Sequence, residues 1–167
     1  MRSKIFGALL CTLSVTGFGS AHAEDATFDM TVMTPETALR IAKAALESCR
    51  AKGYQVAVTV VDRMGVSQAM IRDRFAGPHT PDTSFRKAWT AVSFRGNTVE
   101  LAANTAPGTP QSGARDIKYA LMLGGGVPIE AGGSIVGGVG ISGAPNGEAD
   151  DACARAGIEA VIVDLEM

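Results

Sequence analysis

The stretch that decides the fold is QVAVTVVDRMGVSQAMIRD, residues 55–73. Its first part, residues 55–62, is rich in β-branched valine and threonine, which favour an extended strand. A tight turn at residues 63–65 follows, and residues 66–73 then predict a return strand. The stretch therefore predicts a β-hairpin.

A second hairpin is predicted near the C-terminal end of the chain. Residues 126–130 and 134–142 are its expected strands, and residues 131–133 its turn. The run GGSIVGGVGIS at 132–142 is unusual, because glycine weakens the interior of a strand. Glycines in a strand usually mark a bulge or a place where another backbone comes close. We interpret them as packing residues rather than as a phosphate-binding loop, since no GxxxxGK[ST] pattern is present.

Helices are predicted around these hairpins. The TPET sequence at residues 34–37 is typical of a helix start, with Thr34 as cap and proline in the first turn. The TPDT sequence at residues 80–83 repeats this pattern, so a second helix is expected to begin there. The expected helices are 35–52, one starting at 80, a short one at 98–104, and a last one from 146 or 147 to about 162. Residues 105–115 are expected to form a loop, and 117–123 a short apolar element of undecided type.

The order of these elements defines the fold class. A helix, a hairpin, one or two helices, a second hairpin and a last helix lack the repeated β-α-β order of a parallel sheet. The two hairpins, with an expected fifth strand, predict an α+β domain with an antiparallel sheet of about five strands flanked by helices. Residues 24–167 have the length of one domain.

The first 23 residues are predicted to be a signal peptide. Arg2 and Lys4 supply positive charge, residues 5–18 are mostly apolar, and Ala21-His22-Ala23 has the small-x-small pattern of a cleavage site. The expected location is therefore periplasmic or secreted. No later stretch is long and apolar enough to predict a membrane span.

Charge and cysteine usage narrow the function further. The net charge is −2 at pH 7 and no basic block follows the leader, so nucleic acid and anionic membrane surfaces are not expected partners.

Beyond the leader there are two cysteines, Cys49 and Cys153. They are interpreted as buried free thiols, because lone cysteines behave as small apolar groups. An exported location would also permit a disulfide, but sequence alone cannot place the two within bridging range.

The candidate site is centred on His79, the only histidine in residues 24–167. Arg74 precedes it, and Arg86 and Lys87 follow it within the expected helix. Neutral imidazole can ligate iron, and arginine or lysine can hold carboxylates such as haem propionates. In an alternative interpretation His79 is a general acid or base and Arg86 anchors an organic acid. The structural alternative is a surface or capping histidine.

The loop SGAPNG, residues 142–147, is a second candidate. It joins an expected strand to the N-terminus of the last helix, where free N–H groups attract anions. A plain helix-capping loop is the alternative. Thr80, Ser142 and Gly143 therefore join His79, Arg74, Arg86 and Lys87 as candidate ligand-binding residues, with His79 the candidate metal ligand.

Three blocks of the sequence carry a resemblance to a known family. They are residues 57–94 (AVTVVDRMGVSQAMIRDRFAGPHTPDTSFRKAWTAVSF), residues 123–129 (LGGGVPI) and residues 132–160 (GGSIVGGVGISGAPNGEADDACARAGIEA). In this order they resemble the GlcG/HbpS-like proteins, also called the haem-degrading domain family. The resemblance covers nearly all of residues 34–163.

The resemblance implies a PAS- or profilin-like fold and homo-oligomers, with octamers a family theme. It also implies extracellular haem binding in some members, and a related domain is fused to PduO-type cobalamin adenosyltransferases. The family has no universal haem-ligand motif, so His79 remains a candidate from local chemistry. The expected function is an exported haem-binding protein with haem as cofactor. The alternative is an enzyme or binding module for a small organic acid.

Overall fold

The computed structural model describes residues 25–166, so the predicted leader lies outside the described residues. In this part of the chain four strands form one antiparallel sheet in the order β2-β1-β4-β3. The strands are β1 (Ala57–Asp62), β2 (Ser67–Arg72), β3 (Gly126–Ala131) and β4 (Ser134–Ser142). Both predicted hairpins are present, and they meet where β1 pairs with β4.

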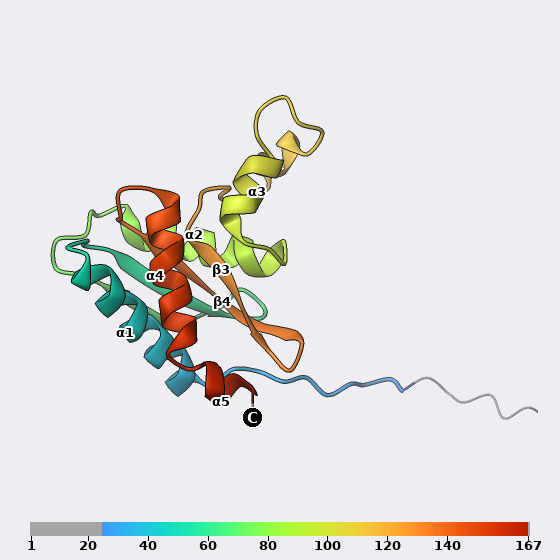
Figure 1. Cartoon of the computed structure of the whole chain (residues 1–167). Helices are drawn as coiled ribbons and strands as arrows, with labels where there is room; N and C mark the ends of the chain where they lie inside the picture. Colours follow the sequence, from blue (N-terminus) through green and yellow to red (C-terminus); the bar gives the residue numbers. More distant parts are fainter. Residues whose placement is uncertain (1–24, 167) are drawn as a thin grey trace, which may run out of the picture.

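Helices cover both faces of the sheet. The helices α1 and α4 lie side by side on one face, α2 lies on the other, and α3 projects from the body with the loop that follows it (Figure 1). The α-helices are α1 (Pro35–Ala51), α2 (Thr80–Ser93), α3 (Thr98–Asn104), α4 (Gly147–Glu159) and α5 (Ile162–Glu166), and a 3-10 turn spans Ser112–Asp116. No helix within residues 25–166 is both long enough and apolar enough to cross a bilayer.

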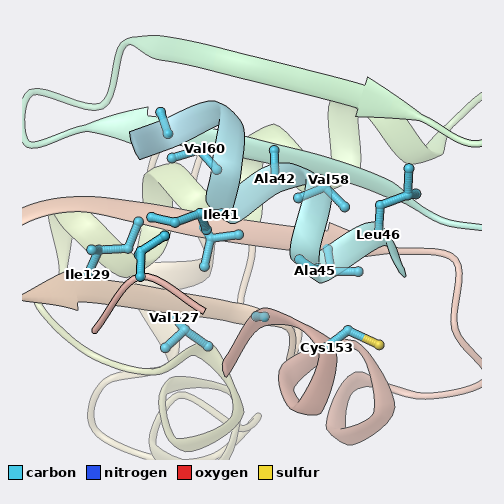
Figure 2. Close-up of a cluster of buried hydrophobic side chains, with 14 of the residues drawn as sticks. Ile41, Ala42, Ala45, Leu46, Val58, Val60, Val127, Ile129 and Cys153 are labelled. Carbon is cyan, nitrogen blue, oxygen red and sulfur yellow. The ribbon is translucent and has the colours of Figure 1, made fainter. Parts of the chain in front are cut away.

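The main core lies between the sheet and the α1–α4 pair. One stripe of α1, including Ile41, Ala45 and Leu46, is buried against Val58 and other strand residues (Figure 2). These helix positions recur at three- and four-residue spacing, which is the period of one helix face. Burial of this apolar stripe holds α1 on the sheet.

The opposite face is built around the glycines of β4. A Cβ atom on Gly140 would lie 2.0 Å from the carbonyl oxygen of Ser84, and one on Gly138 would lie 3.0 Å from that of Ala88. The backbone of α2 therefore rests directly on β4. The glycine-rich strand is a packing feature, as the sequence indicated.

The fold class is confirmed, and one local expectation changes. Residues 117–123, whose type the sequence does not decide, form no strand, and the described sheet has four strands, close to the expected number of about five. Thr34 caps α1 as expected, through its Oγ1 and the backbone N–H of Thr37. Thr80 does not cap α2, because it is the first residue of the helix and its hydroxyl donates to Gly77 O. The cap position belongs to His79.

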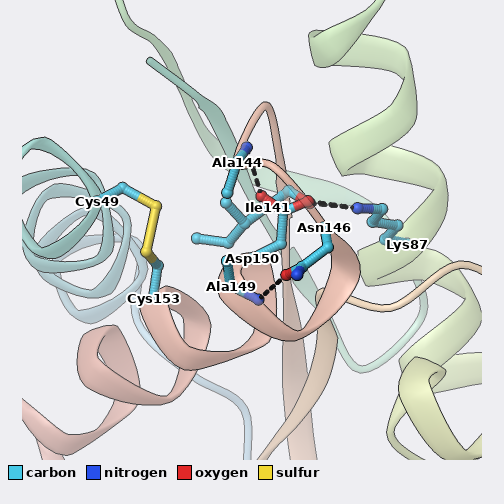
Figure 3. Close-up of a disulfide and its surroundings, with 8 residues drawn as sticks. All are labelled: Cys49, Lys87, Ile141, Ala144, Asn146, Ala149, Asp150 and Cys153. Carbon is cyan, nitrogen blue, oxygen red and sulfur yellow. Dashed lines mark hydrogen bonds and ion pairs between the residues drawn. A yellow bond between two sulfur atoms is a disulfide. The ribbon is translucent and has the colours of Figure 1, made fainter. Parts of the chain in front are cut away.

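The interpretation of the two cysteines as free thiols is wrong. Cys49 of α1 and Cys153 of α4 form a disulfide, with their Cα atoms 5.5 Å apart (Figure 3). Both residues are fully buried. The packing of α1 against α4 brings together two cysteines that are 104 residues apart in sequence.

A bidentate ion pair joins the end of α1 to the segment that leads to His79. Arg50 donates from Nε and one terminal nitrogen to the two carboxylate oxygens of Asp73, each at 2.8 Å. Asp73 is buried, whereas the Arg50 side chain is 43% exposed. The hydrogen bonds from Arg50 lower the pKa of Asp73 to about 2.

This pair predicts an acid-dependent part of the stability. Asp73 is ionised in the folded protein well below its ordinary pKa of 3.8, so its contribution is complete above about pH 4 and is lost as the pH falls toward 2. We expect Asp73→Asn to cost about 1 to 2 kcal/mol at pH 6, a range that allows for solvent screening at Arg50. Urea unfolding at pH 6, 4 and 3 should show that the difference in the free energy of unfolding between Asp73→Asn and the wild type shrinks as the pH falls. A constant difference would contradict this assignment.

Candidate functional site

His79 lies at the entrance to α2 with its side chain exposed. Its imidazole makes no capping hydrogen bond, although the residue occupies the cap position. The ring lies over Gly77, where a Cβ atom would be 2.7 Å from its Cε1. The side chain is therefore held beside the turn without using its nitrogens for the fold.

His79 lines a cavity of about 590 Å³, which we call the histidine cavity. That volume lies within the range of small-molecule sites. The walls come from the end of α1, the loop before α2, the end of β4 and the start of α4. Of the predicted site residues, His79, Thr80, Lys87, Ser142 and Gly143 line it.

Lys87 turns inward rather than outward. Its side chain is almost completely buried, and its ammonium donates to Ile141 O and to Asp150 Oδ2, both at 2.8 Å (Figure 3). Burial raises the pKa of the Asp150 carboxyl, and the Lys87 ammonium acts in the opposite direction. The expectation that Lys87 is available to a ligand's carboxylate is corrected, because its charge is already paired inside the protein.

The SGAPNG loop binds an anionic group of the protein itself, the carboxylate of Asp150. Asp150 Oδ1 accepts from the backbone N–H of Ala144 at 3.0 Å, and the N–H of Gly143 is also directed to this carboxylate. Asn146 caps α4 by accepting from the N–H of Ala149. The capping interpretation of the loop is therefore the better one. Ser142 and Gly143 line the cavity, but the amide donors of Gly143 and Ala144 are engaged with Asp150.

Neither of the predicted arginines lines the histidine cavity. Arg86 donates to the carbonyl oxygen of Ala120 at 3.0 Å and to that of Tyr119 at 3.4 Å, so it holds the segment after the 3-10 turn. The structure thus gives Arg86 a structural role, and its role in ligand binding stays a prediction. Arg74 is exposed and directly precedes Phe75, which does line the cavity.

Sequence reasoning missed the apolar part of this cavity. Tyr54, Phe75 and Leu123 contribute to its walls, and Phe75 is 80% exposed. Gln55 also lines it, and its Oε1 is buried without a hydrogen-bond partner in residues 25–166. The phenylalanine four residues before His79 was the signal available in the sequence. Tyr54, Gln55 and Leu123 come from segments distant in sequence, and no sequence pattern pointed to them.

The donor set limits what the site can hold. Within residues 25–166 no cluster of three or more histidine, cysteine or acidic side chains is arranged to hold a bare metal ion. Both cysteines of this region are in the disulfide. A single imidazole beside aromatic and aliphatic side chains suits a metal that brings most of its own ligands, or an organic molecule.

A four-stranded antiparallel sheet with helices on both faces and a ligand-sized cavity at one end defines a small α+β domain of the PAS or profilin type. Residues 33–159 match the family described as haem degrading protein HbpS-like, and the chain belongs to this family. This agrees with the resemblance seen in the sequence.

Known proteins similar to this chain include solved structures and a curated sequence. A double mutant of Streptomyces reticuli HbpS is 38% identical with a TM-score of 0.78, covering 87% of this chain and 98% of its own. The PduOC:heme complex is 27% identical with a TM-score of 0.74, covering 82% and 100%. An uncharacterized 15.0 kDa protein of Citrobacter freundii, from the dhaT-dhaS intergenic region, is 32% identical over 63% of this chain and 78% of its own length.

Proposed function

We propose that this protein binds haem in the histidine cavity, where His79 would be the residue that ligates the iron. The observation that carries the proposal is an exposed imidazole, free of hydrogen bonds within the described residues, at the wall of a cavity that also contains Phe75, Tyr54 and Leu123. Family membership and the similarity to a domain solved with haem support it.

The residues present fit this group. The porphyrin supplies the four equatorial nitrogens of the iron, so one imidazole from the protein is sufficient at the proximal position. Aromatic and aliphatic side chains suit the apolar ring. The proposed partner of a propionate is Arg74, whose exposed guanidinium lies next to Phe75 in sequence and at the solvent side.

A hemin titration tests the proposal. We expect the wild type to give a saturable Soret shift, and His79→Ala to weaken binding at least about tenfold and to change the Soret position, because the iron loses its protein ligand. Asp82→Asn is the matched control, since this exposed residue lies on the first turn of the same helix and does not line the cavity. A Soret spectrum identical in wild type and His79→Ala would overturn the ligand assignment.

A small organic acid is the second candidate ligand. Gln55, which lines the cavity, favours it, because its Oε1 has no hydrogen-bond partner within residues 25–166 and an unpaired buried acceptor is costly. In this case His79 acts as the acid or base. A thermal-shift screen distinguishes the two: hydroxy acids stabilise the fold under the second candidate, and hemin alone does so under the first.

We also propose that the protein is exported and forms homo-oligomers. The charge and cleavage pattern of residues 1–23 supports export, and a buried disulfide suits an oxidising compartment. Membership of the HbpS-like family, for which the sequence resemblance implies homo-oligomers, supports self-association. Fractionation of the producing cells and light scattering of the purified protein test these two points separately.

A further inference from the structure

A second cavity lies at the other end of α2 from His79. It has a volume of about 670 Å³ and lies between the β1–β2 turn, the C-terminal end of α2 and the β3–β4 turn. We call it the arginine cavity, after Arg63 and Arg95 in its walls. The 14-residue helix α2, roughly 20 Å long, runs from one cavity to the other, and no residue lines both.

The two arginines are not used by the fold. Within residues 25–166 neither guanidinium makes an ion pair or a side-chain hydrogen bond, whereas Arg50, Arg86 and Arg115 all do. Glu130 is the one acidic side chain in the wall and is exposed, so the ionised groups of the cavity leave a net positive charge. Guanidinium groups with free donors bind carboxylates in a bidentate manner.

Arg95 occupies a backbone position that normally takes glycine. The helix α2 ends in a Schellman motif, in which the N–H of Gly96 donates to Ala91 O and that of Arg95 donates to Val92 O. Arg95 therefore sits at the left-handed position after the cap, with φ at 53°. A side chain other than glycine is strained there, and such strain is concentrated at functional sites.

Part of the wall is apolar, beside the polar side chains of Ser93 and Ser134. Trp89 packs against Gly65, where a Cβ atom would lie 2.7 Å from the indole Cδ1. Val92 and Ile135 line the same cavity. These side chains suit an apolar group attached to the anion that the arginines bind.

We propose that the arginine cavity binds a small aromatic monocarboxylate, with the carboxylate on Arg63 and Arg95 and the ring against Trp89. This site is separate from the histidine cavity and does not depend on whether that cavity binds haem. The proposed site gives a function to Arg95, whose backbone is strained, and to the unpaired guanidinium of Arg63.

Trp89 is the only tryptophan of the chain, so its fluorescence reports on this cavity directly. We expect phenylacetate to change the emission in a saturable way. Acetate, which lacks the ring, and 2-phenylethanol, which lacks the carboxylate, should each bind at least about tenfold more weakly, because each loses one of the two contacts.

Arg95→Gly is the decisive variant. It removes the guanidinium and relieves the backbone strain, so phenylacetate should bind at least about tenfold more weakly while Tm rises by a few degrees, roughly 2 to 5 °C. A loss of binding in a more stable protein cannot be attributed to unfolding. Lys43→Ala, which removes an exposed cation from α1, is the control and should bind as the wild type does.

Several results would overturn the proposal. One is an Arg95→Gly variant that binds phenylacetate as tightly as the wild type. Another is equal binding of 2-phenylethanol, or of inorganic phosphate, which would show that the carboxylate or the ring is not recognised. A third is a Trp89 fluorescence that changes with protein concentration and not with phenylacetate. This result would show that the cavity is a contact surface between copies of the chain.

Discussion

Replacing Cys49 and Cys153 together by alanine is expected to lower the free energy of unfolding by about 4 to 5 kcal/mol. The disulfide closes a loop of 104 residues, which includes the whole sheet and α2. A cross-link over such a length removes many conformations from the unfolded chain, so its loss stabilises the unfolded state. Guanidinium denaturation of the two proteins measures the difference.

Reduction supplies the control for this prediction. A reductant should move the unfolding midpoint of the wild type toward that of the double variant and leave the double variant unchanged. Peptide mapping without reduction should yield a peptide pair linked through Cys49 and Cys153. A wild type whose midpoint ignores the reductant, and whose map lacks the linked pair, would restore the free-thiol interpretation.

The parts of the fold that could be predicted are those with a local cause. The hairpins follow from β-branched runs with turns between them, and the helix start at Thr34 follows from its own capping chemistry. The glycines of β4 were also interpreted correctly, since a strand that lacks side chains can accept a neighbouring backbone.

The parts that could not be predicted join distant segments. The disulfide connects residues 104 apart, and Lys87 reaches Asp150 over 63 residues. No periodicity reports such a pairing before the sheet order is known. For the same reason the apolar wall of the histidine cavity, which comes from several separate loops and strand ends, was not foreseen.

The orientation of Lys87 had a signal that was misinterpreted. Arg86 and Lys87 were treated as a basic pair, but adjacent residues of a helix point about 100° apart. Lys87 lies three residues after Ser84 and four before Ala91, and all three are buried. Helical spacing thus placed the lysine on the inner stripe, where a charge requires a partner.

The second large effect is expected from Lys87→Met, which should lower the free energy of unfolding by about 3 to 5 kcal/mol at pH 7. The substitution leaves the Asp150 carboxylate buried without its cation and Ile141 O without its donor. Burial already raises the pKa of Asp150, and in the variant the opposing effect of the ammonium is gone. The pKa of the folded carboxyl, already raised in the wild type, then rises further above its unfolded value. The penalty is therefore smallest below about pH 3, where Asp150 is protonated in both states, and grows as the pH rises.

A double-mutant cycle separates the ion pair from simple loss of packing. In Lys87→Met/Asp150→Asn the amide oxygen still accepts from Ala144 N–H while the buried charge is removed. We expect the double variant to recover about 1 to 3 kcal/mol relative to Lys87→Met, as coupled neighbours do. Unfolding free energies at pH 7 and pH 4 give both the coupling and its pH dependence. Two results together would contradict a role for charge: additive effects of the two substitutions, and the same cost of Lys87→Met at both pH values. In that case the buried pair does not hold β4 and α4 against α2 through charge. Shape alone then positions the wall of the histidine cavity.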